Sequence, residues 1–380
     1  MNQIAVNLIV GSSLLLSFLV FLNPNKYNKQ GNKWLSLFLF CLFLFLLNID
    51  EFLLFNNIDT KKFHLYIFSL YIVTPIFYLT IVYFVNPTKK WKPIYYLHFI
   101  FGLFFVLFEQ NSTTLKDNEI HLLSENISQF SHYTNLFLMN VVLPLQAIFY
   151  ISFSYIEIKK HEKNINQFSS NTNDINLKWL KQIVYYIVFL GTLFVVHIFT
   201  NSIHFLNFAL LICLFFIGYS TIKQKEIFPF PRDQKVEIIE IIQYKSNNEI
   251  EKKKLLSDEK LLKIKNKLIQ IMELKKPFLN SDITLILLAN QIDVSAHLLS
   301  YVINEGFNEN FNQFINRYRI DESKKLILDP KKNNLSILGI GYEVGFNSKS
   351  VFNSTFKKIT GCSPIQYKNK NLLEKTSTEL

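Results

Sequence analysis

The sequence predicts an all-α protein in two parts: an N-terminal bundle of about seven transmembrane helices, and a C-terminal all-α domain with two helix-turn-helix units. Hydrophobic residues make up 49% of the 380 residues and aromatic residues 16%, more than a water-soluble chain of this length requires. Apolar stretches alternate with polar connections up to residue 219. From residue 277 onwards, short stretches of helical periodicity alternate with turn residues and caps.

The apolar stretches have nearly the length that a membrane requires. About 20 helical residues cross the roughly 30 Å of hydrocarbon in a bilayer. The predicted spans are residues 4–22, 34–54, 65–85, 93–108, 136–156, 180–199 and 203–219, of which the fourth and the seventh are short. No basic segment precedes the first span and further spans follow it, so we interpret it as a span and not as a removable signal peptide.

Lysines in the connections predict the orientation of the bundle. The connections after the first, third and fifth spans are rich in lysine, whereas the alternate ones hold few lysines or offset them with acidic residues. The lysines of the rich connections are Lys26, Lys29, Lys33, Lys89, Lys90, Lys92, Lys159, Lys160, Lys163 and Lys178. Because basic loops stay on the cytoplasmic side, we expect a multi-pass membrane protein with its N-terminus outside and its C-terminal domain in the cytoplasm.

Polar and helix-distorting residues inside the spans are candidates for a ligand site. They are Asp50, Glu51, Pro75, Asn140, Pro144, Gln146, His197 and His204. Each also has a structural interpretation as an interfacial residue, a kink or a bond to a neighbouring helix. The histidines have no carboxylate at ligand spacing, and Cys41, Cys213 and Cys362 are isolated, so the sequence predicts no metal, no cofactor and no disulfide framework.

Residues 220–276 form a charged connector between the bundle and the last domain. The run Phe228, Pro229, Phe230 and Pro231 interrupts the exit from the seventh span, and the basic run at 252–254 suits solvent or anionic lipid headgroups. An amphipathic helix is predicted between Ser257, its N-cap, and Pro277, which stops it. This helix can pack on the following domain or pair with its copy in a homodimer.

The strongest local pattern lies at residues 335–367. A short helix is predicted to end at Gly345, a residue free to adopt positive φ, and a second helix is capped by Asn347 or Ser348. The expected inward face of that second helix is Val351, Phe352, Thr355, Phe356 and Ile359. Its expected outward face, which can contact base edges or phosphates, is Lys349, Ser350, Asn353, Ser354 and Lys357. The pattern predicts a helix-turn-helix with a recognition helix.

A second, weaker helix-turn-helix is predicted upstream. Residues 285–292 form its first helix, Asp293 and Val294 its turn, and Ser295 the cap of a helix that runs to about residue 305. Leu298, Leu299, Val302 and Ile303 are expected to face inward, and Ala296, His297, Ser300, Tyr301 and Asn304 outward. We name Ala296, His297, Ser300 and Tyr301 as candidate DNA-binding residues, although this face carries no arginine or lysine.

The two units together resemble the DNA-binding domain of the AraC/XylS family. In the second unit the resemblance rests on Ile340, Gly345, Phe346, Ser350, Phe352, Phe356, Lys357, Lys358, Gly361, Ser363, Pro364 and Tyr367. In the first unit and the joining helix it rests on Leu288, Ala289, Ser295, Leu299, Phe311, Phe314, Ile315, Arg319 and Ile320. The resemblance covers roughly residues 274–370, and a seven-span domain followed by a charged connector is a known arrangement among such regulators.

Two residues depart from the family pattern. Gly341 stands where the family usually has alanine, and a helical glycine costs about 1 kcal/mol while permitting close helix approach. Ser354 stands where many members carry a base-contacting arginine, so sequence preference does not carry over from relatives.

The resemblance implies a membrane-embedded, sequence-specific transcriptional regulator and no enzyme. Its expected domains are residues 1–219 (membrane sensor), 220–276 (connector), 277–370 (DNA-binding) and 371–380 (tail). Its expected partners are double-stranded promoter DNA, the lipid bilayer, an unknown small ligand or membrane signal, and a second copy of the chain.

Three alternatives stay open. A membrane enzyme lacks support because the sequence has no Walker loop, Gly-x-Ser-x-Gly, His-Glu-x-x-His or kinase-like nucleotide box. A regulated transporter would be supported by inverted repeats or paired broken helices, and we find neither. A protein-interaction adaptor whose C-terminal domain no longer binds DNA is consistent with Ser354 and with the uncharged first recognition helix.

Overall fold

The computed structural model describes residues 3–23, 27–47, 60–87, 89–100, 102–104, 134, 137–172, 175–200, 204–227, 256–332 and 334–378. These residues are helical and form no β-strand, which confirms the predicted all-α fold. One isolated antiparallel bridge joins Ser169 and Thr284. The chain divides into two compact units: Met1–His161 with Leu177–Ile227, and Glu162–Asn176 with Phe228–Leu380. A segment between two helices of the first unit therefore belongs to the second.

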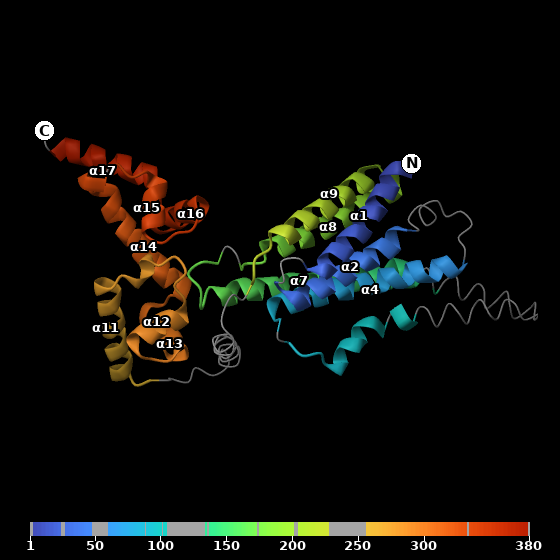
Figure 1. Ribbon diagram of the computed structural model, residues 1–380, viewed down its shortest axis with the longest axis horizontal. Coiled ribbons are helices and arrows are strands. Elements are labelled where there is room, and N and C mark those ends of the chain that lie inside the picture. Colours follow the sequence, from blue (N-terminus) through green and yellow to red (C-terminus); the bar gives the residue numbers. More distant parts are fainter. Residues whose placement is uncertain are drawn as a thin grey trace, which may run out of the picture. The chain divides into compact units, whose positions relative to one another are not determined.

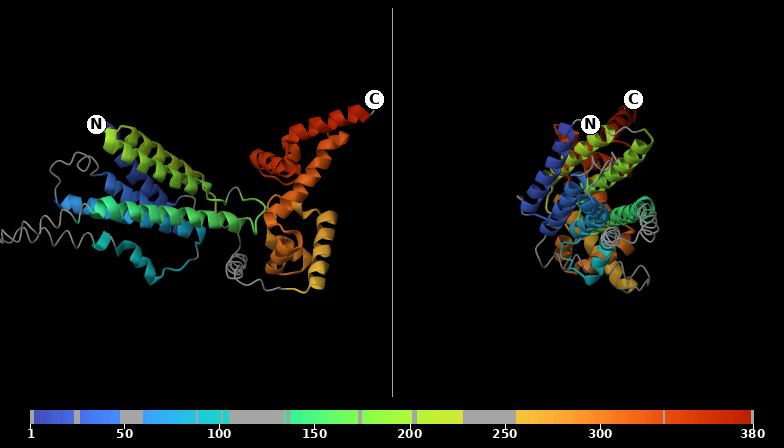
Figure 2. Two further views of the ribbon diagram at one scale, coloured as in Figure 1. Left: turned by 180° about the vertical axis from the view of Figure 1, so that it is seen from behind. Right: turned by 90° about the vertical axis from the view of Figure 1, so that its right-hand side faces the viewer.

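Long apolar helices form the first unit and run side by side in Figures 1 and 2. They are α1 (Gln3–Leu22), α2 (Lys29–Leu46), α4 (Thr60–Val85), α7 (Leu143–Ile165), α8 (Lys178–Thr200) and α9 (His204–Lys223). Helix α2 packs against α1 and α4, and α9 packs against α1 and α8. A 3-10 helix, η1 (Pro93–Phe99), occupies the start of the predicted fourth span, and a π-helical segment, η2 (Leu138–Val142), leads into α7.

Three described helices of this unit are long and apolar enough to cross a membrane by length and composition, over Phe68–Val85, Asn140–Ile165 and Lys178–Val196. Shorter apolar helices, Val6–Leu22 and Asn207–Lys223, occupy the predicted first and seventh spans. Asp50 and Glu51 lie outside the described residues, as do the side chains of His197 and His204.

Pro75 and Gln146, two of the polar or distorting residues in the spans, have a shared structural role. Pro75 lies inside α4, where its ring removes the backbone donor for the carbonyl four residues earlier, that of Tyr71. The side chain of Gln146, on α7, is buried and donates from Nε2 to this Tyr71 oxygen at 2.8 Å. A backbone group that the proline leaves open is thus satisfied from a neighbouring helix.

The second unit is built around one central helix, α14 (Phe311–Leu328), which contacts α13, α15, α16 and α17 (Figure 1). One half of the unit consists of α11 (Asp258–Leu274), the 3-10 turn η3 (Pro277–Leu279), α12 (Leu285–Ile292) and α13 (Ala296–Phe307). The other half consists of the turn η4 (Pro330–Lys332), α15 (Ile337–Glu343), α16 (Lys349–Thr360) and α17 (Pro364–Thr378). Because α14 packs on both halves, it sets their spacing.

Each half has its own apolar core. In the half that contains α11 to α13, Leu268, Met272, Leu285, Leu288, Leu299, Val302 and Phe314 are completely buried. The apolar helices α12 and α13 are bent by 96° relative to each other. Because their large apolar side chains are buried in this core, we interpret the pair as part of the domain and not as a broken membrane span. In the other half, Ile320, Ile327, Ile340, Val344, Phe346, Phe352 and Phe356 form the core.

Gly341 allows the closest helix approach in that second core. A Cβ atom at this position would lie 2.8 Å from Cδ1 and 3.0 Å from Cγ of Phe352, a side chain of the neighbouring helix α16. These atoms belong to a ring that is itself buried, so the ring has no free space into which it can move. The predicted compensation for a helical glycine, a close approach of two helices, is therefore present.

Candidate nucleic-acid interface

The turn between α15 and α16 has the hydrogen bonds of a Schellman motif. Gly345 adopts φ of 95°, the N–H of Gly345 donates to Tyr342 O at 3.0 Å, and the N–H of Phe346 donates to Gly341 O at 3.0 Å. This confirms the predicted helix end at Gly345. The motif satisfies the last carbonyls of α15 and turns the chain sharply towards α16.

Helix α16 begins at a serine cap and anchors its apolar face in the core. Ser348, one of the two predicted caps, accepts a hydrogen bond from the N–H of Val351 at 3.3 Å. Phe352 and Phe356 are buried as predicted. The predicted inward position of Ile359 was wrong, because its side chain is 41% exposed: it lies in the last turn of the helix, after the chain has passed the core.

The outward face of α16 presents most of the predicted contact residues to solvent. Lys349, Ser350, Ser354 and Lys357 are exposed, and Asn353 is half-buried. The Ser354 hydroxyl donates to the carbonyl of Val351 at 3.1 Å, so its hydrogen is already used within the helix. Lys349, Lys357 and Lys358 make no ion pair within the described residues, which leaves three cations available to phosphate.

The turn between α12 and α13 repeats this construction with different residues. Asp293 takes the left-handed conformation at φ of 56°, and the N–H of Val294 donates to Ala289 O at 3.2 Å. Ser295 then caps α13 by accepting from the N–H of Leu298 at 3.2 Å. Both predicted helix-turn-helix units are therefore formed by a left-handed residue followed by a serine cap.

Helix α13 differs from the prediction on its outward side. Ala296 and Ser300 were predicted to face out, but they are only 1% and 9% exposed. They lie four residues apart on one stripe of a helix that packs against both α11 and α12, and their small side chains permit that double contact. The outward placement of Ala296 and Ser300 was therefore wrong, because helical periodicity alone does not show that two neighbours cover one helix.

His297 and Tyr301 remain as the partly exposed candidates on α13. Burial lowers the pKa of His297 from its ordinary value of 6.5, so its imidazole is neutral at pH 7. A neutral imidazole carries one donor and one acceptor, which suits a base edge better than a phosphate. Helix α13 therefore presents polar side chains and the acidic Glu305, whereas α16 presents polar side chains and lysines.

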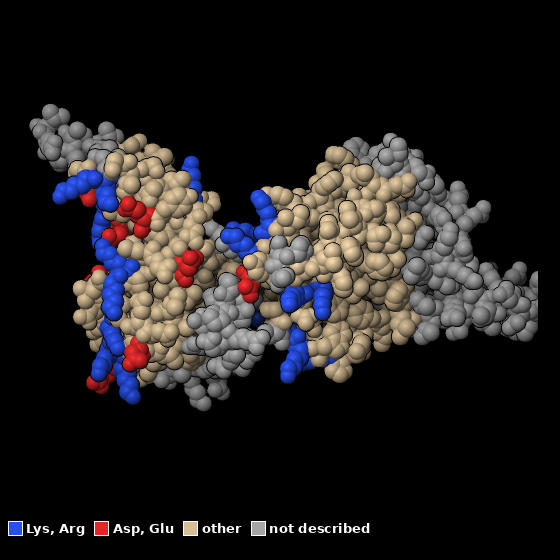
Figure 3. Space-filling view, in the orientation of Figure 1, with Lys and Arg blue, Asp and Glu red and all other residues tan. Residues whose placement is uncertain are grey.

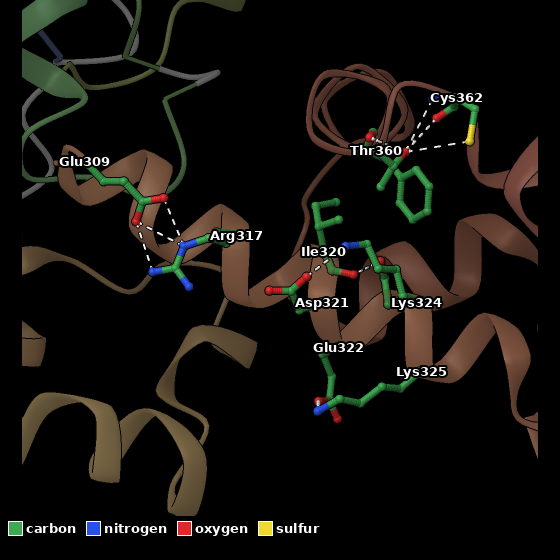
Figure 4. A network of polar contacts seen from close by, with 11 residues as sticks. Glu309, Arg317, Ile320, Asp321, Glu322, Lys324, Lys325, Thr360 and Cys362 are labelled. Atoms are coloured by element: carbon green, nitrogen blue, oxygen red, sulfur yellow. Dashed lines mark hydrogen bonds and ion pairs between the residues drawn. The ribbon is translucent and has the colours of Figure 1, made fainter. Parts of the chain in front are cut away.

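Other lysines of the second unit are engaged with acidic residues of the same chain. Lys324 pairs with Asp321 at 2.9 Å and Lys332 with Glu343 at 3.4 Å. Along α14, Figure 4 shows the Lys324 pair together with the bidentate contact of Arg317 with Glu309, at 2.9 and 3.1 Å. These pairs reduce the positive charge that the domain presents.

A separate group of lysines lies on α11. Figure 3 shows them along the edge of the second unit that α11 occupies in Figure 1. Lys260, Lys263, Lys267 and Lys275 are exposed there. This surface can attract phosphate or anionic headgroups, but it lies on neither recognition helix.

Parts of this chain are similar to a family model, a curated relative and a solved structure. Residues 288–370 match a family model described as a helix-turn-helix domain. A curated relative, an uncharacterized HTH-type transcriptional regulator in the cgkA 5' region of Pseudoalteromonas carrageenovora, is 33% identical over 109 residues, which cover 28% of this chain and 62% of the relative. The chain thus matches less than two thirds of that relative's length. The solved C-terminal domain of AraT, a response regulator from Geobacillus stearothermophilus, is 29% identical over 31% of this chain and 88% of that chain, with a TM-score of 0.26.

The second unit therefore contains a helix-turn-helix domain with two such units joined by a long helix. More particularly, it is a helix-turn-helix domain of the AraC type, as the sequence motifs imply, and this family is non-enzymatic. Three features of the domain escaped the sequence analysis: the engaged hydroxyl of Ser354, the available Lys358, and the contacts of residues 166–170. The last had a signal in the sequence, the apolar residues Ile165, Phe168 and Ile175 spaced along a mostly polar connection.

Proposed function

We propose that the chain is a membrane-embedded regulator of transcription that binds promoter DNA sequence-specifically through α13 and α16. The outward face of α16 carries this proposal: Lys349 and Lys357 are exposed and available, while Phe352 and Phe356 hold the helix in the core. Two recognition helices on one rigid central helix suit two successive major grooves, about one helical turn apart. Residues 277–370 would be the DNA-binding domain.

The proposed role of residues 1–219 is to anchor the protein in the bacterial inner membrane and to sense a signal there. Large apolar side chains are exposed along these helices, among them Phe18, Phe149, Phe189 and Phe215, as is typical of a surface that faces lipid. The lysine distribution supports seven spans with the N-terminus outside. A small ligand or membrane state would alter promoter affinity or dimerisation, and a coupling of about 1–3 kcal/mol gives a five- to 150-fold change.

The test uses the full-length protein in nanodiscs of phosphatidylethanolamine and phosphatidylglycerol. Random-sequence duplex DNA is selected over several rounds at low salt, and the enriched sites are titrated with increasing salt. We expect enrichment of a site with two half-sites about one helical turn apart, and an affinity that falls steeply with salt. Absence of any enriched sequence at low salt would contradict the proposal.

A protein-interaction adaptor is the second candidate function, favoured by the absence of lysine and arginine from α13 and by the burial of Ala296 and Ser300. Double substitution of Lys349 and Lys357 by alanine separates the two functions. A DNA-binding regulator would lose its effect on transcription in cells, whereas an adaptor would keep it.

A further inference from the structure

The segment Glu162–Asn176, which we call the docking loop, is bound to the DNA-binding domain although it connects α7 and α8. Its backbone pairs with residues 283–285, which lead into α12. Leu285 N–H donates to Phe168 O at 2.9 Å, and Ser170 N–H donates to Ile283 O at 3.4 Å. Phe168, Ser169 and Ser170 are buried, with 1%, 6% and 5% of their surface exposed. An ordinary connection runs over the surface in solvent, and this one does not.

The docking loop satisfies backbone donors at the beginnings of two helices. The first four N–H groups of a helix have no partner within it. Leu285 begins α12, and its N–H is taken by Phe168 O, while the N–H of Asn312, in the first turn of α14, is taken by Asn166 O at 3.0 Å. The Asn312 side chain adds two more bonds, from Nδ2 to Ser169 O at 3.2 Å and to Ser170 O at 2.9 Å.

The docking loop also reaches the residue that joins the two halves of the domain. Arg319 of α14 is 2% exposed and donates to Phe278 O and Asn280 O, each at 2.8 Å, and to Ser170 Oγ of the loop at 3.2 Å. Its guanidinium lies over the ring of Phe346, in the turn between α15 and α16 of the other half. A Cβ atom on Gly345 would come within 3.0 Å of Arg319 Nε. Loop, first half and second half therefore meet at one buried side chain.

We propose that the docking loop transmits the state of the membrane helices to the DNA-binding domain, and that the docked form is the one that binds DNA well. Both ends of the loop continue directly into α7 and α8, so a displacement of either helix pulls on it. Docking holds the beginnings of α12 and α14 by hydrogen bonds and supplies the Ser170 hydroxyl that Arg319 contacts. These contacts together hold the two recognition helices at a constant spacing. Detachment releases all three. This inference rests on the proposed function, because its readout is DNA affinity.

A disulfide can hold the docking loop in place. Ser169 and Thr284 face each other in an antiparallel bridge whose hydrogen bonds are formed by their neighbours, so they are a non-hydrogen-bonded pair. Such pairs have Cα atoms about 4.5 Å apart, within the range that a disulfide spans. We would combine Ser169→Cys with Thr284→Cys in a chain carrying Cys362→Ser; the remaining cysteines, Cys41 and Cys213, are buried. Each single cysteine variant serves as a control.

Asn312→Asp is the matching variant that detaches the docking loop. It keeps the oxygen that accepts from Asn316 Nδ2 at 2.9 Å, but places a carboxylate oxygen against the carbonyls of Ser169 and Ser170. Asn266→Asp, at an exposed position on α11, introduces the same charge without touching the loop. The full-length proteins are compared in nanodiscs by titration with the selected DNA site, oxidised and reduced.

We expect Asn312→Asp to lower DNA affinity at least fivefold and Asn266→Asp to change it less than twofold. In the Asn312→Asp chain, the oxidised cysteine pair should restore the affinity, and the reduced pair should not. The inference is overturned by unchanged or tighter binding of Asn312→Asp, by failed rescue after oxidation, or by failure of the disulfide to form without Asn312→Asp. If the unsubstituted chain binds no DNA sequence selectively, the proposed function fails and the inference fails with it. That outcome is recognised before any variant is measured.

Discussion

At the scale of single residues, Arg319 places a charged guanidinium in the interior of the domain. Burial lowers the pKa of its guanidinium to about 10, so it remains charged at pH 7 without a carboxylate in direct contact. Its charge is balanced by carbonyl and hydroxyl oxygens instead. We expect Arg319→Met to reduce the free energy of opening of α14 by about 3 kcal/mol, because several buried carbonyls lose their donor. Amide hydrogen exchange of the full-length protein measures this quantity.

Arg317→Met is the matched control for that substitution. Arg317 holds Glu309 bidentately, but both side chains are partly exposed, at 35% and 22%. Pairs of this kind contribute about 1 kcal/mol or less. Equal effects of the two substitutions on hydrogen exchange would contradict the role assigned to Arg319.

Gly341 gives a second prediction at this scale. We expect Gly341→Ala to destabilise the half formed by α15 to α17 by about 1–3 kcal/mol, because the added methyl group meets the ring of Phe352 and overpacks the core. Gly339→Ala, in the same helix, has only contacts of 3.3 Å or more and should be neutral or slightly stabilising. Thermal melting compares the two. A stable Gly341→Ala variant would show that the core adapts.

The sequence was informative for residues whose role is local. Gly345 and Ser348 were predictable because helix ends and caps depend on their own backbone and on neighbours within a few residues. Ala296, Ser300 and Ile359 were misplaced because their burial depends on how many other helices cover the same face. That information resides in packing and not in the period of a single helix.

At the scale of elements, α16 should dominate the electrostatic part of DNA binding. Each lysine that neutralises a phosphate contributes about one unit to the slope of log affinity against log salt concentration. We expect Lys349→Ala and Lys357→Ala each to lower that slope by about one. Lys324→Ala should leave it nearly unchanged, since Lys324 is already paired with Asp321. Titrations at several salt concentrations measure the slopes.

The contact between η3 and α14 predicts a dependence on pH. Burial alone would raise the pKa of Glu322, but hydrogen bonds and charge from Lys276 and Lys325 hold this pKa below its ordinary value of 4.5. The carboxylate therefore stabilises the fold fully above pH 4.5, and this contribution is lost as pH falls through the lowered pKa. We expect Glu322→Gln to reduce the loss of thermal stability on acidification, by at most about 1 kcal/mol. Glu343→Gln, whose pair with Lys332 is 41% exposed on both sides, is the comparison.

At the scale of elements, the contacts of the docking loop could not be predicted from the sequence. Its contacts join positions more than a hundred residues apart and use mainly backbone carbonyls, which every sequence possesses. No periodicity or motif identifies a carbonyl that will meet the beginning of a particular helix. The spaced apolar residues Ile165, Phe168 and Ile175 were the sequence feature that distinguished this connection from an ordinary polar loop.

For the whole molecule, the orientation in the membrane is the prediction that the function depends on. We expect a cysteine introduced at Lys90, after the third predicted span, to react with a membrane-impermeant maleimide only after the cells are opened. A cysteine at Lys116, in the following connection, should react in intact cells, because that connection is predicted to lie outside. The opposite pattern would place the helix-turn-helix domain away from DNA.

Gln146 and Pro75 also limit how the first unit can change shape. The hydrogen bond from Gln146 Nε2 to the Tyr71 carbonyl links α7 to α4, and Pro75 supplies no N–H to that carbonyl. If α7 turned about its own axis, the Gln146 side chain would leave the Tyr71 carbonyl and this hydrogen bond would be lost. This hydrogen bond therefore opposes rotation of α7 relative to α4.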